Sequence, residues 1–298
     1  GYYIRAIRWH FLLKHIKPFK PRELFPYLVM GFMFNNILPA RAGEFIRAYI
    51  TGAKKGISKS STFATIVIER VFDGLVMIFY FILGYMAFHY VKLQKSDVPS
   101  FEMFGTQMGI KEAVTLFAIG GNAVFAGIFL VSIFLVHKKE PTVRFLHKIV
   151  SVFPAKFGEL FNKLIDTFIE GFGVLKSKKD LAIVMFFSFF AWTIEASTYY
   201  LMAIAMGIEI NILVVFLIMA VSNFAIMAPS TSGGVGPFEF FGVGVMLLFY
   251  NMKAAAVSYV LLIHSMILLP IIALGFVFLF TEGMNFKQLI KAKEEENA

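Results

Sequence analysis

The segment Pro229-Ser-Thr-Ser-Gly-Gly-Val-Gly-Pro237-Phe-Glu239 interrupts residues 211–250, a stretch that is otherwise almost entirely apolar. Proline lacks an N–H donor and glycine loses much backbone entropy on ordering, so a helix cannot continue through this segment. The apolar piece that follows, residues 238–250, is shorter than the roughly 20 residues that a membrane span needs. We therefore predict a re-entrant hairpin of two half-helices meeting at a polar tip. The alternative is a loop outside the membrane between two full spans.

Inside a membrane, an opened backbone is tolerated only where it is buried in protein or lines a water-filled cavity. The candidate substrate-binding residues of this tip are Ser232, Gly233, Gly234, Gly236 and Glu239. The helix that begins near Pro237 has a partly positive N-terminus, which favours an anion. We expect Glu239 to pair with a cationic headgroup or, across the cavity, with Arg41 of a second tip.

Composition predicts an all-α polytopic membrane protein with a single transmembrane domain over residues 1–298. Hydrophobic residues make up 58% of the chain and charged residues 16%, and several apolar runs exceed the length of a span. The chain has no cysteine, which excludes disulfides and cysteine-based metal sites, and we expect no cofactor. The net charge of +9 lies in loops beside apolar runs, which favours anionic lipid over nucleic acid as the partner.

Four apolar runs are long enough for full spans: residues 61–88, 112–136, 181–206 and 254–280. Residues 1–13, with Arg5 and Arg8, are expected to be either the end of a truncated helix or an interfacial helix. Residues 23–52 are broken by Asn35-Asn36-Ile-Leu-Pro39-Ala-Arg41. This break predicts a second re-entrant hairpin.

The tip of the first hairpin carries amide and charged side chains. Its candidate substrate-binding residues are Asn35, Asn36, Arg41, Glu44 and Arg47. The planar fork of a guanidinium matches phosphate oxygens, so we expect Arg41 to bind a phosphate. The alternative for Arg41 and Arg47 is that they extend to the membrane interface beside Glu44.

The distribution of Lys and Arg predicts the orientation in the cell membrane. Residues 14–22, 53–60, 137–180 and the tail from 281 hold 19 of them, whereas residues 89–111, 207–210 and 251–253 hold 4. The basic side is expected to be cytoplasmic, together with the C-terminus. This assignment requires both hairpins to return to the side they entered, from opposite sides. Such an arrangement predicts an inverted-topology repeat with its site near the midplane.

Charges within the spans form a further set of candidates. Glu69, Arg70 and Asp73 lie three and four residues apart on neighbouring helical faces, and they predict either a coupling site or a structural ion pair. Glu195 stands alone in its span. We count it with these three residues as a candidate for coupling, in which it would exchange protons, or for a structural ion pair. The alternative is a neutral acid bonded to a nearby hydroxyl.

Residues 137–180 contain an apolar stripe at helical spacing between Phe157 and Phe172, with basic flanks. The pattern predicts an amphipathic segment, which lies along the cytoplasmic interface or packs beneath the bundle.

Three motifs, taken in order, resemble the membrane domain of the lysylphosphatidylglycerol synthase/flippase family. They are Asn35-Asn36-x-x-Pro39-x-Arg41-x-Gly43-Glu44-x-x-Arg47, Glu69-Arg70-x-x-Asp73 and Pro229-(x)4-Gly234-x-Gly236-x-x-Glu239. The resemblance extends from Arg5 to about residue 280. It implies re-entrant helices and translocation of a phospholipid or a polyprenyl-linked glycolipid. The soluble aminoacyl-transferase domain of the bifunctional members has no counterpart in residues 1–298.

Three functions fit this pattern. A lipid translocase moves a headgroup through a polar midplane cavity, and an ion-coupled small-solute carrier uses the same architecture. A lipid-modifying enzyme is disfavoured, because only His264 lies within a predicted span. No His/Asp pair stands out, and no paired-carboxylate metal motif at helical spacing stands out beyond Glu69/Asp73. We therefore expect a translocase and no enzyme. A homo-oligomer remains open.

Overall fold

The computed structural model describes residues 1–39, 41–91, 100–103, 106–109, 177–226 and 231–284, with a few single positions between 112 and 127. Nearly all of the span predicted at 112–136 and of the amphipathic segment predicted at 137–180 lies outside the described residues. The described part is helical apart from one two-stranded antiparallel hairpin, β1 (Ser100–Met103) with β2 (Thr106–Gly109). That hairpin lies in a segment predicted to be a loop.

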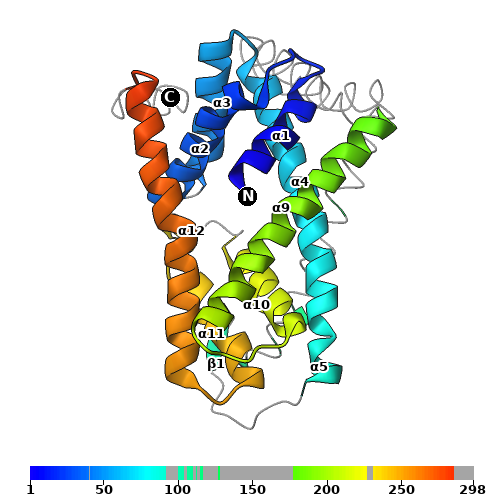
Figure 1. Ribbon diagram of the computed structural model, residues 1–298, viewed down its shortest axis with the longest axis vertical. Helices are drawn as coiled ribbons and strands as arrows, with labels where there is room; N and C mark the ends of the chain where they lie inside the picture. The colour runs from blue at the N-terminus through cyan, green and yellow to red at the C-terminus, as the bar shows by residue number, and fades with distance from the viewer. Residues whose placement is uncertain are drawn as a thin grey trace.

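Three long helices extend through both the upper and the lower half of the molecule (Figure 1). They are α4 (Lys59–Tyr85), α9 (Lys178–Ala205) and α12 (Lys253–Thr281), with 27, 28 and 29 residues. At about 1.5 Å per residue each is about 40 Å long, more than the roughly 30 Å of a bilayer's hydrocarbon core. Large apolar side chains lie on the outside of α9 and α12, among them Leu201 and Leu269, which are 61% and 64% exposed. The chain is therefore a helical, multi-pass membrane protein.

The remaining helices are shorter. They are α1 (Tyr2–Leu13), α2 (Pro21–Ile37), α3 (Ala42–Lys55), α5 (Ala87–Tyr90), α10 (Ile212–Ala225) and α11 (Pro237–Phe249). In Figure 1, α2 and α3 lie in the upper half of the molecule, whereas α10 and α11 lie in the lower half. The short 3-10 helix η2 (Ser232–Gly234) precedes α11. By length and apolar composition α9, α12 and the stretch Ser232–Phe249 are able to cross a membrane, but η2 and α11 in that stretch are separated by Val235 and Gly236.

The short helices α2 and α3 form one pair and α10 and α11 another. Within each pair, the two helices are separated where the backbone leaves helical geometry. Arg41, which precedes α3, has a φ of 55°, and Gly236, which precedes α11, has a φ of 99°. Gly233 and Gly234 also have positive φ values, a region that only glycine adopts without strain. A Cβ at Gly234 would lie 2.3 Å from Cγ2 of Ile226. The glycines of the central motif thus serve a sharp, closely packed turn.

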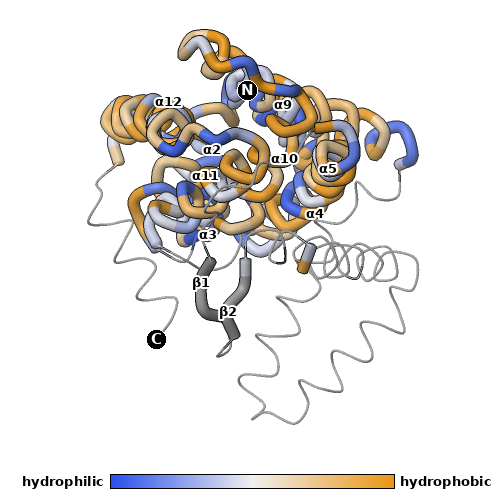
Figure 2. Tube along the Cα trace, turned by 90° about the horizontal axis from the view of Figure 1, so that it is seen from below, coloured by the Kyte–Doolittle hydropathy of each residue, from blue (hydrophilic) through white to orange (hydrophobic). Residues whose placement is uncertain are grey.

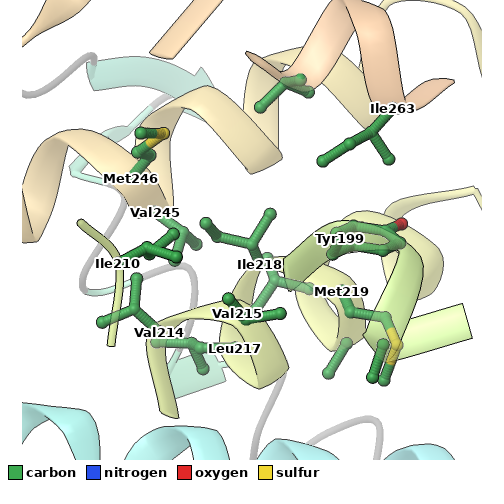
Figure 3. Close-up of a cluster of buried hydrophobic side chains, with 14 of the residues drawn as sticks. Tyr199, Ile210, Val214, Val215, Leu217, Ile218, Met219, Val245, Met246 and Ile263 are labelled. Carbon is green, nitrogen blue, oxygen red and sulfur yellow. The ribbon is translucent and has the colours of Figure 1, made fainter. Parts of the chain in front are cut away.

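The buried apolar side chains form two clusters, one in each half of the molecule. The first joins α10 and α11 to α4, α9 and α12, and Figure 3 shows Val215 and Ile218 of α10 beside Val245 of α11 and Tyr199 of α9. The second joins α1, α2 and α3 to other parts of the same long helices. Seen from below, hydrophobic residues predominate along α10 and α12 (Figure 2). The two clusters hold the helix ends near Asn36 and Gly233 in place.

Candidate functional site

A cavity of about 150 Å³ lies where the ends of α2 and α10 approach each other. This is about the size of an engineered protein cavity that binds benzene, so it holds a small polar group rather than a whole lipid. Its polar lining comprises Tyr2, Arg5, Asn35, Asn36, Arg41, Arg70, Asp73, Glu195, Asn223 and Thr231, together with Gly233 and Gly234. The structure thus brings candidates from both predicted tips and from two long helices to one place.

Arg5 and Glu195 form one wall of the cavity. Nη2 of Arg5 donates to Oε2 of Glu195 at 3.0 Å, and its Nη1 lies 3.6 Å from Oδ1 of Asp73. The guanidinium carbon is 4.6 Å from the ring centroid of Trp192, within the range of a cation–π contact. Glu195 stands alone among the charges of its own span, and the structure gives it an arginine partner from α1. An ion pair is one of the roles predicted for it, and the coupling role stays a prediction.

Asp73 is bound from three sides beneath this wall. Arg8 donates to both of its carboxylate oxygens, at 2.5 and 3.2 Å, and Nε1 of Trp192 donates to Oδ1 at 2.9 Å. Arg70 adds a contact of 3.2 Å to Oδ2. A buried carboxylate with this many donors is stabilised in its charged form, and removing one donor would leave charge uncompensated.

Arg41 and Arg70 share one carboxylate at the rim of the cavity. Glu44 Oε1 lies 3.0 Å from Nη2 of Arg41 and 3.0 Å from Nε of Arg70. The side chain of Arg41 is 31% exposed, more than that of Arg70 at 19%. Glu44 itself is not part of the cavity lining. It positions two guanidinium groups that are.

Arg47 and Glu69 lie outside the cavity. The two guanidinium nitrogens of Arg47 donate to the two oxygens of Glu69 at 3.1 and 3.0 Å. The guanidinium carbon also lies 3.6 Å from the ring centroid of Trp9, and the side chains of Arg47 and Glu69 are 2% and 0% exposed. This geometry replaces the two roles predicted for Arg47, substrate contact and extension to the interface, with that of a structural ion pair.

The charges around the cavity do not cancel. Five arginines (Arg5, Arg8, Arg41, Arg47 and Arg70) are linked to four carboxylates (Glu44, Glu69, Asp73 and Glu195). One positive charge therefore remains. Arg41 has the most exposed side chain of these five arginines. The arrangement is suited to a singly charged anion.

The carboxylate of the second tip faces away from Arg41. Oε2 of Glu239 accepts a hydrogen bond from the backbone N–H of Gly236 at 2.7 Å, and Oε1 contacts Nδ1 of His264. Because Arg41 pairs with Glu44, the pair expected between Arg41 and Glu239 is not formed. Neither Ser232 nor Gly236 belongs to the cavity lining, so their predicted contact with substrate has no counterpart in this structure.

Sequence reasoning did not assign Arg5, which lines the cavity, or Arg8 and His264, which contact the cavity residues Asp73 and Gly233. Arg5 and Arg8 are three residues apart in a mainly apolar helix, a spacing that places both on one face. Charged and histidine side chains within apolar helices usually face a bundle interior, so this signal was available. Within the part of the chain that the structure describes, no three His, Asp or Glu side chains are grouped as metal ligands.

Comparison with known proteins places these features in a family. The model of the lysylphosphatidylglycerol synthase TM region matches residues 1–275. A UPF0104 membrane protein of Methanothermobacter thermautotrophicus is 25% identical over 247 residues, covering 80% of this chain and 67% of that protein. A second UPF0104 membrane protein, of Pyrococcus horikoshii, is 26% identical over 279 residues, covering 87% of this chain and 77% of that protein.

Glycosyltransferase AglD of Haloferax volcanii is 28% identical over 246 residues. The match covers 78% of this chain and only 39% of that protein. No solved structure matches the chain. The family match extends over nearly the whole chain, and we conclude that this protein belongs to the lysylphosphatidylglycerol synthase TM region family.

Proposed function

We propose that this protein translocates a lipid with an anionic headgroup across the cell membrane. The headgroup passes through the cavity while the acyl or prenyl tails stay in the bilayer. The observation that carries the proposal is the surplus positive charge at a cavity that both helix tips line. A phosphodiester carries one negative charge, which matches the single unbalanced arginine.

The lengths of the short helices support two re-entrant hairpins. The helices α2, α3, α10 and α11 have 17, 14, 14 and 13 residues. At about 1.5 Å per residue they reach about 20–26 Å, less than the hydrocarbon core of a bilayer. The two pairs occupy opposite halves of Figure 1. Their ends approach closely, since a Cβ at Gly233 would lie 3.1 Å from the backbone oxygen of Asn36.

The second helices of the two pairs begin alike, which supports an inverted repeat. Before α3, Arg41 has a positive φ and is followed three residues later by Glu44; before α11, Gly236 has a positive φ and is followed three residues later by Glu239. A carboxylate in the first turn stabilises a helix N-terminus. Two hairpins of opposite direction with their site at the tips are typical of alternating-access transporters.

Asn35 supports a headgroup that also carries a hydroxyl. It lines the cavity, and its Oδ1 is buried without a hydrogen-bond partner among the described residues. That oxygen lies at the contact with α3, since a Cβ at Gly43 would be 2.8 Å from it. An amide side chain is both a donor and an acceptor, so the two asparagines that line the cavity, Asn35 and Asn36, are able to bind a ligand hydroxyl. Glycerol and sugar headgroups provide phosphate and hydroxyl together, which agrees with a phospholipid or a polyprenyl-linked glycolipid. The name of the Haloferax relative, a glycosyltransferase, is compatible with the second class.

The test is lipid movement in vesicles that contain the purified chain. The vesicles contain fluorescent phosphatidylglycerol or phosphatidylcholine, each labelled on an acyl chain. An impermeant reductant is added outside, and the rate at which label from the inner leaflet becomes accessible to it is compared for the two lipids. We expect phosphatidylglycerol to move between the leaflets much faster than phosphatidylcholine does, and much faster than it moves in protein-free vesicles. If neither lipid moves and a trapped soluble phosphate ester leaves the vesicles, the protein is a small-solute carrier. Chemical conversion of the lipid would instead indicate an enzyme.

A further inference from the structure

His264 lies near the middle of α12, with 4% of its side chain exposed. Its ring stacks on that of Phe238, with the ring centroids 4.1 Å apart. A titratable side chain buried within a membrane helix is costly and is usually functional. The proposed passage of a lipid headgroup assigns no role to this histidine.

Both ring nitrogens of His264 face oxygen acceptors. Nδ1 contacts Oε1 of Glu239, and Nε2 lies 3.0 Å from the carbonyl oxygen of Gly233. A neutral imidazole has one N–H donor and one lone pair, so it donates to only one of these oxygens. The second contact needs one more proton, carried either by the ring or by the carboxyl group of Glu239. The pair therefore holds one proton more than a carboxylate and a neutral imidazole would.

In the described part of the chain, Glu239 is the charged group that contacts His264. Titratable groups on the other helices packed against α12 have other partners. The helix α9 carries Glu195, which is bound to Arg5, and Tyr199, whose backbone oxygen accepts from Tyr259. The helix α2 carries Tyr27, whose hydroxyl donates to Glu282 at the far end of α12. The extra proton thus belongs to the contact between α11 and α12.

We propose that Glu239 and His264 form a proton-binding site that holds the second tip against α12. The site acts on the cavity through Gly233, which lines it and whose added Cβ would lie 3.1 Å from the backbone oxygen of Asn36 in the first tip. When the proton leaves, the carboxylate keeps the remaining N–H because a charge-assisted hydrogen bond is stronger. Nε2 then presents a lone pair to the Gly233 carbonyl, and the tip is released.

Two substitutions separate proton binding from structural support. In Glu239→Gln the amide donates to Nδ1, so a neutral imidazole satisfies both contacts and the tip stays held without the extra proton. His264→Ala removes both contacts. His89 is exposed and lies at the end of α5, so His89→Ala is the matched control for loss of a histidine.

The tip is followed with a nitroxide at Val235→Cys, a position that is 55% exposed in a chain without native cysteine. Spectra are recorded in nanodiscs between about pH 5 and about pH 9, the range in which histidine titrates. We expect the ratio of mobile to immobile label to rise up to about tenfold with pH in the otherwise native chain, as loss of the hydrogen bond to the Gly233 carbonyl implies. Glu239→Gln should keep the low ratio throughout, His264→Ala the high ratio, and His89→Ala the native profile. A flat native profile, or a Glu239→Gln profile that follows the native one, would overturn the proposal.

The role of this site in transport rests on the proposed function, and the vesicle assay is run on the same variants. We expect lipid movement to depend on pH in the native chain and not in Glu239→Gln. If the nitroxide responds as expected but no lipid moves at any pH, the proton site stands and the translocase proposal fails. If lipid moves and the nitroxide does not respond, the proton site fails alone.

Discussion

Arg5 on α1 and Glu195 on α9 lie 190 positions apart in the sequence and form an ion pair of 3.0 Å at the wall of the cavity. The contact neutralises the one carboxylate of α9 that lines the cavity. The wall formed by α1 and α9 is thus already balanced by the protein's own charges. Under the proposed function, the charge of a bound anion is met instead at Arg41, which also lines the cavity.

Glu195→Gln should leave the protein folded and somewhat less stable. Arg5 keeps its contact with Asp73 and with the ring of Trp192, and the side chain of Glu195 is 22% exposed. The loss therefore lies between that of an exposed pair, about 0–1 kcal/mol, and that of a buried one, about 3–5 kcal/mol. We expect the free energy of unfolding to fall by about 1–2 kcal/mol, measured by thermal unfolding in detergent. Unchanged stability would mean that the pair contributes nothing.

Glu69→Gln should be much more damaging, because Glu69 is fully buried and binds both nitrogens of the Arg47 fork. Removing one partner of a buried ion pair costs about 3–5 kcal/mol. We expect a large loss of monodisperse protein and of thermal stability. Glu209→Gln, at an exposed position, is the matched control and should be neutral. If the two variants are equally stable, the buried pair is not structural.

Much of the helical architecture could be predicted, because helix length and helix breakers are local signals. The span expected at residues 254–280 is α12, Lys253–Thr281. The breaks near Arg41 and Gly236 also lie where proline and glycine indicated. The β1–β2 hairpin was missed, since its strands are only four residues long and carry too little pattern to distinguish them from a loop.

The residues of the cavity could be predicted less well, because side-chain partners depend on how each helix is rotated about its axis. Asn36 and Gly233 both line one cavity, whereas the location of that cavity at the membrane midplane stays a prediction. The direction of Glu239 was not predictable, since it depends on His264 of a different helix. Arg5 was overlooked as a partner of Glu195, because nothing local links residues so far apart.

Gly43→Ala should weaken the packing of α3 on α2. An added Cβ would lie 2.0 Å from the backbone oxygen of Gly31 and 2.5 Å from the backbone nitrogen of Asn35. Backbone atoms move only with their helix, so we expect a loss at the upper end of overpacking, about 3 kcal/mol. Gly56→Ala is the control: its φ is 65° but its Cβ would enter open space, so only the conformational cost of about 1 kcal/mol applies. Equal thermal shifts for both variants would contradict this close helix contact.

Opposite ends of α4 should face opposite sides of the membrane. Ala53→Cys lies near the end of α3, which precedes α4, and Tyr90→Cys lies at the end of α5, which follows it. Both positions are exposed in a chain without cysteine. An impermeant thiol reagent should label Tyr90→Cys in intact cells and Ala53→Cys only after permeabilisation, since the basic side is expected to be cytoplasmic. The reverse pattern would invert the orientation. Equal labelling in intact cells would remove the basis for the two hairpins.

The most direct test of the central claim is the rate of phosphatidylglycerol movement in vesicles with Arg41→Gln, compared with Arg22→Gln. Both variants lose one arginine, but Arg41 lines the cavity whereas Arg22 is exposed near the start of α2. Glutamine has a Cβ, as arginine has, so the substitution does not change the steric cost of the positive φ at residue 41. We expect Arg41→Gln to slow movement at least about tenfold, as loss of one charged hydrogen bond implies, with Arg22→Gln within about twofold of the native rate. Native-rate movement by folded Arg41→Gln would contradict passage of the headgroup through this cavity.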